Sequence, residues 1–102
     1  MNTYTTPTLP VTIADINFAD VQVFRFKMAQ PNRTVLKVIE AGSEYIDAEH
    51  NKIYVPLTQK ETAKFKDGDA QVQIRIKFNN GTVLATEKKT VSVEEVLDEV
   101  II

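Results

Sequence analysis

Cysteine and tryptophan are absent from this chain of 102 residues, and histidine occurs once. Because there is no cysteine, the chain can form neither a disulfide framework nor a thiolate metal site. Catalysis by a histidine base would have to centre on His50, which lies between Glu49 and Asn51 in a polar, turn-like segment. We interpret His50 as a solvated turn residue, and we expect no catalytic residue, no metal site and no cofactor.

A strong excess of either charge is also lacking. The chain has 12 Lys and Arg against 14 Asp and Glu, a net charge of -2, with the two signs interspersed. Proteins that bind a nucleic-acid backbone normally carry a basic excess, so we expect no nucleic-acid partner. No apolar run approaches the roughly 20 residues of a membrane span, and the first residues do not have the pattern of a signal peptide. We therefore expect a protein that is made in the cytoplasm and has no membrane partner.

What the chain does contain is a regular alternation of apolar and polar residues. Along residues 71–78 every second residue is apolar, which is the period of a strand with one buried face. The pair Asn80-Gly81 follows and favours a type I′ turn. Residues 82–86 and 90–93 are again rich in β-branched side chains. The pattern predicts a hairpin that reverses at residues 79–81 and needs the rest of the chain to cover its apolar face.

Further strand-like segments precede this hairpin. Pro10 and Pro56 each lack the N–H that a central strand donates, so each predicts a strand at a sheet edge. Val23 and Phe24 are adjacent apolar residues at which the alternation changes phase, as at a β-bulge or a strand covered on both faces. The predicted strands are residues 9–13, 21–30, 34–40 and 52–57, and residues 45–47 are either a short strand or the entry to a turn.

One short helix is predicted between the strand at residues 52–57 and the hairpin. Thr58 and Glu61 have the spacing of a capping box, in which each side chain accepts a hydrogen bond from the other residue's backbone. The helix would run over residues 59–65. At that length it depends on packing against the sheets, and we expect it to cross between strands at one end of the domain.

These elements together predict an all-β fold. Strands separated by turn signals every 8–12 residues or so are typical of two packed antiparallel sheets. We predict an immunoglobulin-like antiparallel β-sandwich of about seven strands with one short crossover helix. Residues 9–94 would form the sandwich domain, residues 1–8 an extended N-terminal arm, and residues 95–102 an apolar C-terminal tail.

Three surfaces are candidates for binding. A basic strip would lie on the outward faces of two strands, either open to an anion or paired with nearby glutamates such as Glu40, Glu44 and Glu87; its members are Arg25, Lys27, Arg75 and Lys77. Tyr45 and Tyr54, together with Pro56, would form a small aromatic patch for a sugar or a protein, although tyrosine is also common in strands.

The third surface is the apolar end of the chain, Val100, Ile101 and Ile102. An exposed apolar terminus marks a contact site, so it would pack on its own domain or on another subunit, and we favour the second. The spacing of Val96, Leu97 and Val100 suits a helical turn, but the segment is equally suited to a strand completed by a partner.

Several short motifs in a fixed order resemble a family of small proteins encoded in the tail modules of phages and prophages of Firmicutes. More distantly, the chain is similar to the N-terminal domain of phage upper baseplate proteins, which is an immunoglobulin-like β-sandwich. The motifs are Thr5-Thr6-Pro7-Thr8 with Leu9-Pro10, Ala29-Gln30, Leu57-Thr58-Gln59-Lys60-Glu61-Thr62, Gln73-Ile74-Arg75-Ile76, and Val91-Ser92-Val93 with Val96-Leu97.

The resemblance implies a non-enzymatic structural protein of the virion, located in the tail or baseplate, with other tail or baseplate proteins as partners. A sandwich with open edges and a Thr/Pro arm is suited to strand addition between subunits, so we expect a homo-oligomer. Assembly contacts are predicted at Thr5, Thr6, Pro7 and Thr8 of the arm and at Val100, Ile101 and Ile102 of the tail. The alternative is a carbohydrate- or host-surface-binding module that uses Tyr45 and Tyr54.

Overall fold

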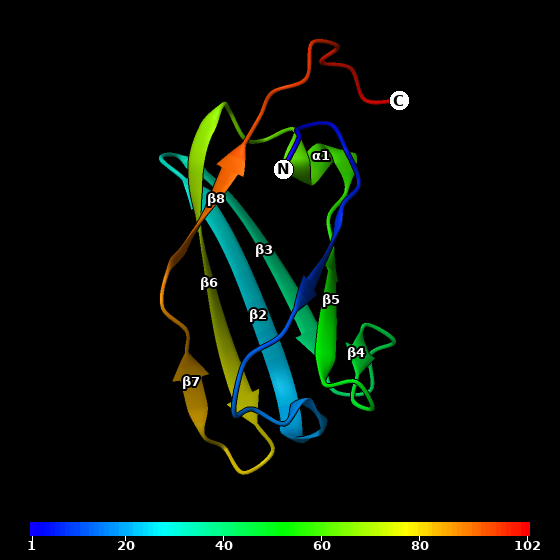
Figure 1. Ribbon diagram of the computed structural model, residues 1–102, viewed down its shortest axis with the longest axis vertical. Coiled ribbons are helices and arrows are strands. Elements are labelled where there is room, and N and C mark those ends of the chain that lie inside the picture. Colours follow the sequence, from blue (N-terminus) through cyan, green and yellow to red (C-terminus); the bar gives the residue numbers. More distant parts are fainter.

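A computed structural model describes all residues from Met1 to Ile102, and it contains two antiparallel β-sheets packed face to face (Figure 1). The strands are β1 (Thr8–Val11), β2 (Val21–Gln30), β3 (Arg33–Glu40), β4 (Ile46–Asp47), β5 (Lys52–Pro56), β6 (Gly68–Phe78), β7 (Val83–Ala85) and β8 (Lys89–Val93). The helices are a 3₁₀ turn, η1 (Phe18–Asp20), and α1 (Gln59–Thr62).

The strand order is that of an immunoglobulin-like sandwich. One sheet has the order β1-β5-β4, and the other has the order β3-β2-β6, with β7 and β8 both pairing along the far side of β6. In immunoglobulin terms these are strands B, E and D facing C′, C, F and a divided G. The eight strands thus fill seven positions, and α1 crosses from β5 in one sheet to β6 in the other. The predicted fold class is confirmed.

A single core lies between the sheets. Phe24 of β2 is fully buried and is flanked in its own sheet by Ile39 of β3 and Ile76 of β6. Ile53 and Val55 of β5, also fully buried, come from the opposite sheet. The complete core is Phe18, Val21, Phe24, Phe26, Met28, Val35, Ile39, Ile53, Val55, Leu57, Phe65, Ala70, Ile74, Ile76 and Val93.

The irregularity predicted in β2 is a β-bulge, but it lies earlier than its predicted position. The register against β6 shifts between Val21 and Val23, so Gln22 is the extra residue. Because a bulge reverses the alternation, Val21 is buried together with Phe24, and Val23 faces outward. The phase therefore changes between Val21 and Val23, and not at the pair Val23 and Phe24.

The predicted hairpin of β6 and β7 is present, but its turn is not type I′. Lys77 pairs with Val83, and Phe78 N–H donates to Thr82 O at 2.9 Å, which leaves a three-residue loop, residues 79–81. Within this loop only Gly81 has a positive φ, +89°, whereas a type I′ turn needs two residues with positive φ. The loop has the form of a turn followed by a left-handed glycine, the usual three-residue hairpin.

The prediction from the two prolines is half right. Pro10 lies in β1, which pairs only with β5 and is an edge strand. Pro56 lies in β5, which is the central strand of its sheet, between β1 and β4. It is tolerated there because it is the last residue of β5, opposite Thr8, where a missing N–H interrupts the ladder least.

The capping box predicted at the start of α1 is present. Glu61 N–H donates to Thr58 Oγ1 at 3.2 Å, and Thr58 N–H donates to Glu61 Oε1 at 2.9 Å. The α-helix ends at Thr62, earlier than predicted, and a turn then places Phe65 in the core. Glu61 also accepts a hydrogen bond from Lys37 Nζ at 3.0 Å, which ties α1 to β3.

The ion pair between Lys37 and Glu61 predicts a pH dependence of stability. Partial burial acts to raise the pKa of Glu61, but hydrogen bonds from Thr58 and Lys37 outweigh it, and the pKa lies below its ordinary value. A carboxylate whose pKa is lowered on folding stabilises the protein above its unfolded-state pKa, and this contribution is lost as pH falls through the folded-state pKa.

The test compares wild type with Glu61→Gln by urea unfolding. Near neutral pH we expect wild type to be more stable by about 1 kcal/mol or less, as is usual for partly exposed pairs. This difference should shrink from about pH 5 to pH 3, as Glu61 is protonated. A difference independent of pH would mean that the charge on Glu61 contributes nothing.

Candidate interaction surfaces

The outer face of the five-stranded sheet carries four cations from two neighbouring strands. Arg25 of β2 lies directly opposite Arg75 of β6, Val23 lies opposite Lys77, and Lys27 lies one pair further along the same face as Arg25. We call the surface formed by Arg25, Lys27, Arg75 and Lys77 the basic face. The register thus places the predicted basic strip on two neighbouring strands.

No carboxylate pairs with the basic face. The side-chain ion pairs of the structure are Lys37 with Glu61 and His50 with Asp47, so the glutamates expected as partners of the strip form no ion pair with it. Like charges placed directly opposite each other destabilise a sheet, and here Arg25 and Arg75 face each other without a compensating anion. The arrangement costs stability in the isolated chain.

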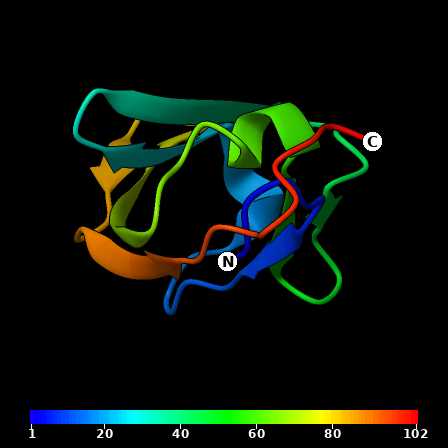
Figure 2. The ribbon, with the colours of Figure 1, turned by 90° about the horizontal axis from the view of Figure 1, so that it is seen from above.

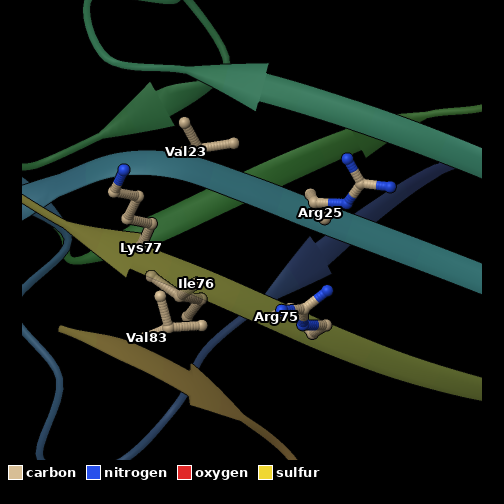
Figure 3. Close-up of a pocket in the computed structure, with 6 residues that line it drawn as sticks. All are labelled: Val23, Arg25, Arg75, Ile76, Lys77 and Val83. Carbon is tan, nitrogen blue, oxygen red and sulfur yellow. The ribbon is translucent and has the colours of Figure 1, made fainter. Parts of the chain in front are cut away.

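Apolar side chains flank the basic face on both sides. Leu36 and Val38 of β3, opposite Lys27 and Arg25, are 42% and 48% exposed, and Val83 of β7, opposite Lys77, is 49% exposed. A shallow hollow of about 180 Å³ lies between the strands (Figure 3), and its lining residues are Val23, Arg25, Arg75, Ile76, Lys77 and Val83. These apolar flanks were not predicted from the sequence, because the exposure of outward-facing side chains depends on which other elements cover that side of the sheet.

The N-terminal arm packs against its own domain. Thr3 is fully buried, its N–H donates to Glu94 O at 2.9 Å, and Asn2 forms a parallel bridge with Glu94. Thr5 is held by Thr62 of α1, whose Oγ1 accepts from Thr5 N–H at 3.1 Å and donates to Thr5 O at 2.9 Å.

The remaining predicted contact residues of the arm lie beyond Thr5. Thr6 is exposed, Pro7 accepts a hydrogen bond from Leu57 N–H at 2.9 Å, and Thr8 begins β1. Thr6 and Thr8 are thus the two threonines of this group whose side chains face outward into solvent.

The C-terminal tail is attached at its base and exposed beyond it. Val96 N–H donates to Thr3 Oγ1 at 3.2 Å. The rest of the tail has no helix or strand, so the helical turn considered for it is absent. Its far end lies beside α1 (Figures 1 and 2), where Gln59 bonds Ile102 N–H and O at 3.0 and 2.7 Å. The exposed apolar side chains are Leu97 at 103%, Val100 at 58%, Ile101 at 45% and Ile102 at 93%.

The two tyrosines of the predicted aromatic patch lie opposite each other. Ile46 pairs with Ile53, and one residue further along Tyr54 N–H donates to Tyr45 O at 2.9 Å. Pro10 of β1 pairs with Tyr54 on its other side. Tyr45 is 38% exposed and Tyr54 is half-buried. The structure therefore brings the two tyrosines together, with Pro10 as a third ring that the sequence did not indicate.

His50 forms a local pair in an exposed turn. Its Nδ1 lies 2.8 Å from Asp47 Oδ2, and its backbone N–H donates to Asp47 Oδ1 at 3.2 Å. The hydrogen bond from the His50 side chain holds the pKa of Asp47 below its ordinary value. The structure contains no group of three His, Asp or Glu side chains placed to hold a metal ion. None of its helices is long and apolar enough to span a membrane.

Comparisons of the chain with protein-family models, with curated proteins and with solved structures found no match.

Proposed function

We propose that this protein is a non-enzymatic structural component of a phage or prophage tail or baseplate, which acts by protein–protein assembly. It would be made in the host cytoplasm and incorporated into the virion with other tail proteins and further copies of itself. The order of short motifs, from Thr5-Thr6-Pro7-Thr8 to Val96-Leu97, supports the phage assignment. The surface of the molecule supports assembly.

The observation that carries the assembly role is where the exposed apolar side chains gather. Most of them lie in the tail or beside the basic face: Leu97, Val100, Ile101 and Ile102 in the first, Leu36, Val38 and Val83 in the second. Scattered exposed apolar residues are ordinary, but gathered ones mark contact sites. Two such surfaces on one small domain are what a subunit with two neighbours needs.

The test is quantitative mass spectrometry of purified particles together with light scattering of the purified protein. We expect the chain at a fixed copy number per particle and a concentration-dependent mass above that of the monomer. Absence from intact particles together with abundance in the lysate would contradict the virion role. A monomer at every concentration would contradict self-assembly.

A second candidate function, carbohydrate or host-surface binding, is favoured by the row of Pro10, Tyr54 and Tyr45 across the outer face of the smaller sheet. Aromatic rings side by side offer an apolar platform of the kind on which a sugar ring can pack. If the row binds glycans, Tyr54→Ala should remove a glycan-array signal that Tyr54→Phe retains. Equal signals from wild type and Tyr54→Ala would dispose of this function.

A further inference from the structure

We infer that the tail of one copy binds across the basic face of a second copy of this chain. The inference rests on the proposed assembly function and names its two contacting surfaces. It joins the two places where apolar side chains are exposed, and it joins opposite charges.

Charge complementarity is the first argument. The tail and its base contain Glu94, Glu95, Asp98 and Glu99 and no cation, whereas the basic face has four cations and no paired carboxylate. Within the free chain the acidic groups lie close together, and a hydrogen bond to Glu95 and its charge raise the pKa of Glu99. A partner that brings acidic and basic groups together relieves the repulsion on both surfaces.

Apolar matching is the second argument. The exposed part of the tail carries Leu97 before its two acidic residues and Val100, Ile101 and Ile102 after them. The basic face likewise has apolar residues on both sides of its cations, Leu36 and Val38 at one side and Val83 at the other. Side chains of an extended segment alternate between two faces, so Leu97, Glu99 and Ile101 share one face. An extended tail can therefore place Glu99 over the cations, with Leu97 and Ile101 over the two apolar flanks.

The lengths agree as well. Six extended residues, 97–102, span about 20 Å at roughly 3.3 Å per residue. The distance from β3 across β2 and β6 to β7 is three strand spacings, or about 14 Å at roughly 4.8 Å each. A tail of this length is sufficient to cross all four strands.

The tail of the same molecule is directed elsewhere. It leaves β8 at the end of the sandwich and lies beside α1, where Gln59 holds Ile102 (Figures 1 and 2). Helix α1 contacts Lys37, which faces the same side of β3 as the buried residues Val35 and Ile39. The basic face is on the outward phase of the same sheet, so the tail does not reach it in its own molecule. A tail that binds the basic face of a neighbour gives up the two bonds between Ile102 and Gln59.

A contact between different surfaces of two identical chains is heterologous. Each copy that accepts a tail still offers its own, so the association continues until it closes into a ring or extends as a filament.

The test reverses charge on each surface and measures self-association by sedimentation. We expect Arg25→Glu/Arg75→Glu and Asp98→Lys/Glu99→Lys each to weaken association about tenfold or more, because each places like charges together. Combining all four substitutions in one chain should restore association, since the signs are then exchanged. The matched control, Lys52→Glu/Lys64→Glu, changes net charge by the same amount away from the basic face and should leave association unchanged.

The outcomes separate this inference from the proposed function. Wild-type association that neither reversal weakens would overturn the inference and leave assembly intact through other surfaces. A wild type that stays monomeric would overturn both. Asp98→Lys/Glu99→Lys could instead change the thermal stability at every protein concentration and leave association unchanged. That result would show that the tail acts on its own domain, and it would also overturn the inference. Raising the ionic strength from about 0.15 to 1 M shortens the Debye length from about 8 to 3 Å and should weaken wild-type association.

Discussion

Replacement of Phe24 by alanine is expected to lower the free energy of unfolding by about 3–5 kcal/mol, the usual cost of emptying a buried phenylalanine site. Phe24 has no exposed surface and lies in a row between Ile39 and Ile76, beneath the opposite sheet. Neighbours held in two hydrogen-bonded strands can collapse only partly into the cavity. Because single domains are stable by about 5–15 kcal/mol, this substitution removes a large share of the total.

Urea unfolding of Phe24→Ala, Phe24→Leu and Leu36→Ala measures this effect. Phe24→Leu should lose less free energy of unfolding than Phe24→Ala, since leucine keeps most of the side-chain volume. If Phe24→Ala does not fold, the comparison is made with Phe24→Leu. Leu36 lies on the neighbouring strand, but its side chain faces outward and is 42% exposed. Leu36→Ala should therefore lower the free energy of unfolding by much less than Phe24→Ala. Equal losses for Phe24→Ala and Leu36→Ala would contradict the placement of the core.

The strands could be predicted because alternation reports burial directly. In β6 the inward residues Ile74 and Ile76 and the outward residues Arg75 and Lys77 follow the two-residue period that one buried face imposes. The helix start was equally local, since Thr58 and Glu61 satisfy each other's backbone groups. Features fixed by neighbours along the chain are legible in the sequence.

Features that depend on which strands pair in the sheet could not be predicted from the sequence. Pro56 has no N–H to donate, but whether this missing donor would fall at a sheet edge or at a strand end depends on the sheet order. The pair Asn80-Gly81 permits two positive φ values, and the register of β6 with β7 uses only one, at Gly81. Likewise Val23 and Phe24 show that the phase changes, whereas the pairing with β6 decides that Gln22 is the extra residue.

The same distinction holds for the candidate surfaces. The outward phase of two strands identified the cations of the basic face, but only the register shows that Arg25 and Arg75 are opposite each other and unpaired. Leu36 and Val38 become part of that surface only because nothing covers the outer side of β3. An interaction surface of this kind is a property of the sheet, so it is visible once the strand order is known.

The N-terminal arm is held to helix α1 by the hydroxyl of Thr62. Replacement of Thr62 by valine is expected to loosen the arm around Thr5 at a cost of about 1–3 kcal/mol, because the N–H and O of Thr5 lose their partner while Thr3 keeps its bonds to Glu94 and Val96. Thr62 is fully buried, and its hydroxyl bonds both the N–H and the O of Thr5. Valine has nearly the same shape, so the loss reflects the hydrogen bonds and not a cavity.

Hydrogen exchange at the Thr5 amide measures this release, and Thr62→Ser, which keeps the hydroxyl, is the matched control. We expect faster exchange and faster proteolysis around Thr5 in Thr62→Val than in Thr62→Ser, whereas residues 1–3 stay bonded to Ser92 and Glu94. Self-association of the same variants then discriminates between the two predicted contact segments. If the tail and the basic face make the contact, Thr62→Val should associate like wild type, because Thr62 holds the arm at Thr5 and the bond from Val96 N–H to Thr3 Oγ1 at the base of the tail remains. A change in association that follows the release of the arm would instead assign the contact to Thr5, Thr6, Pro7 and Thr8.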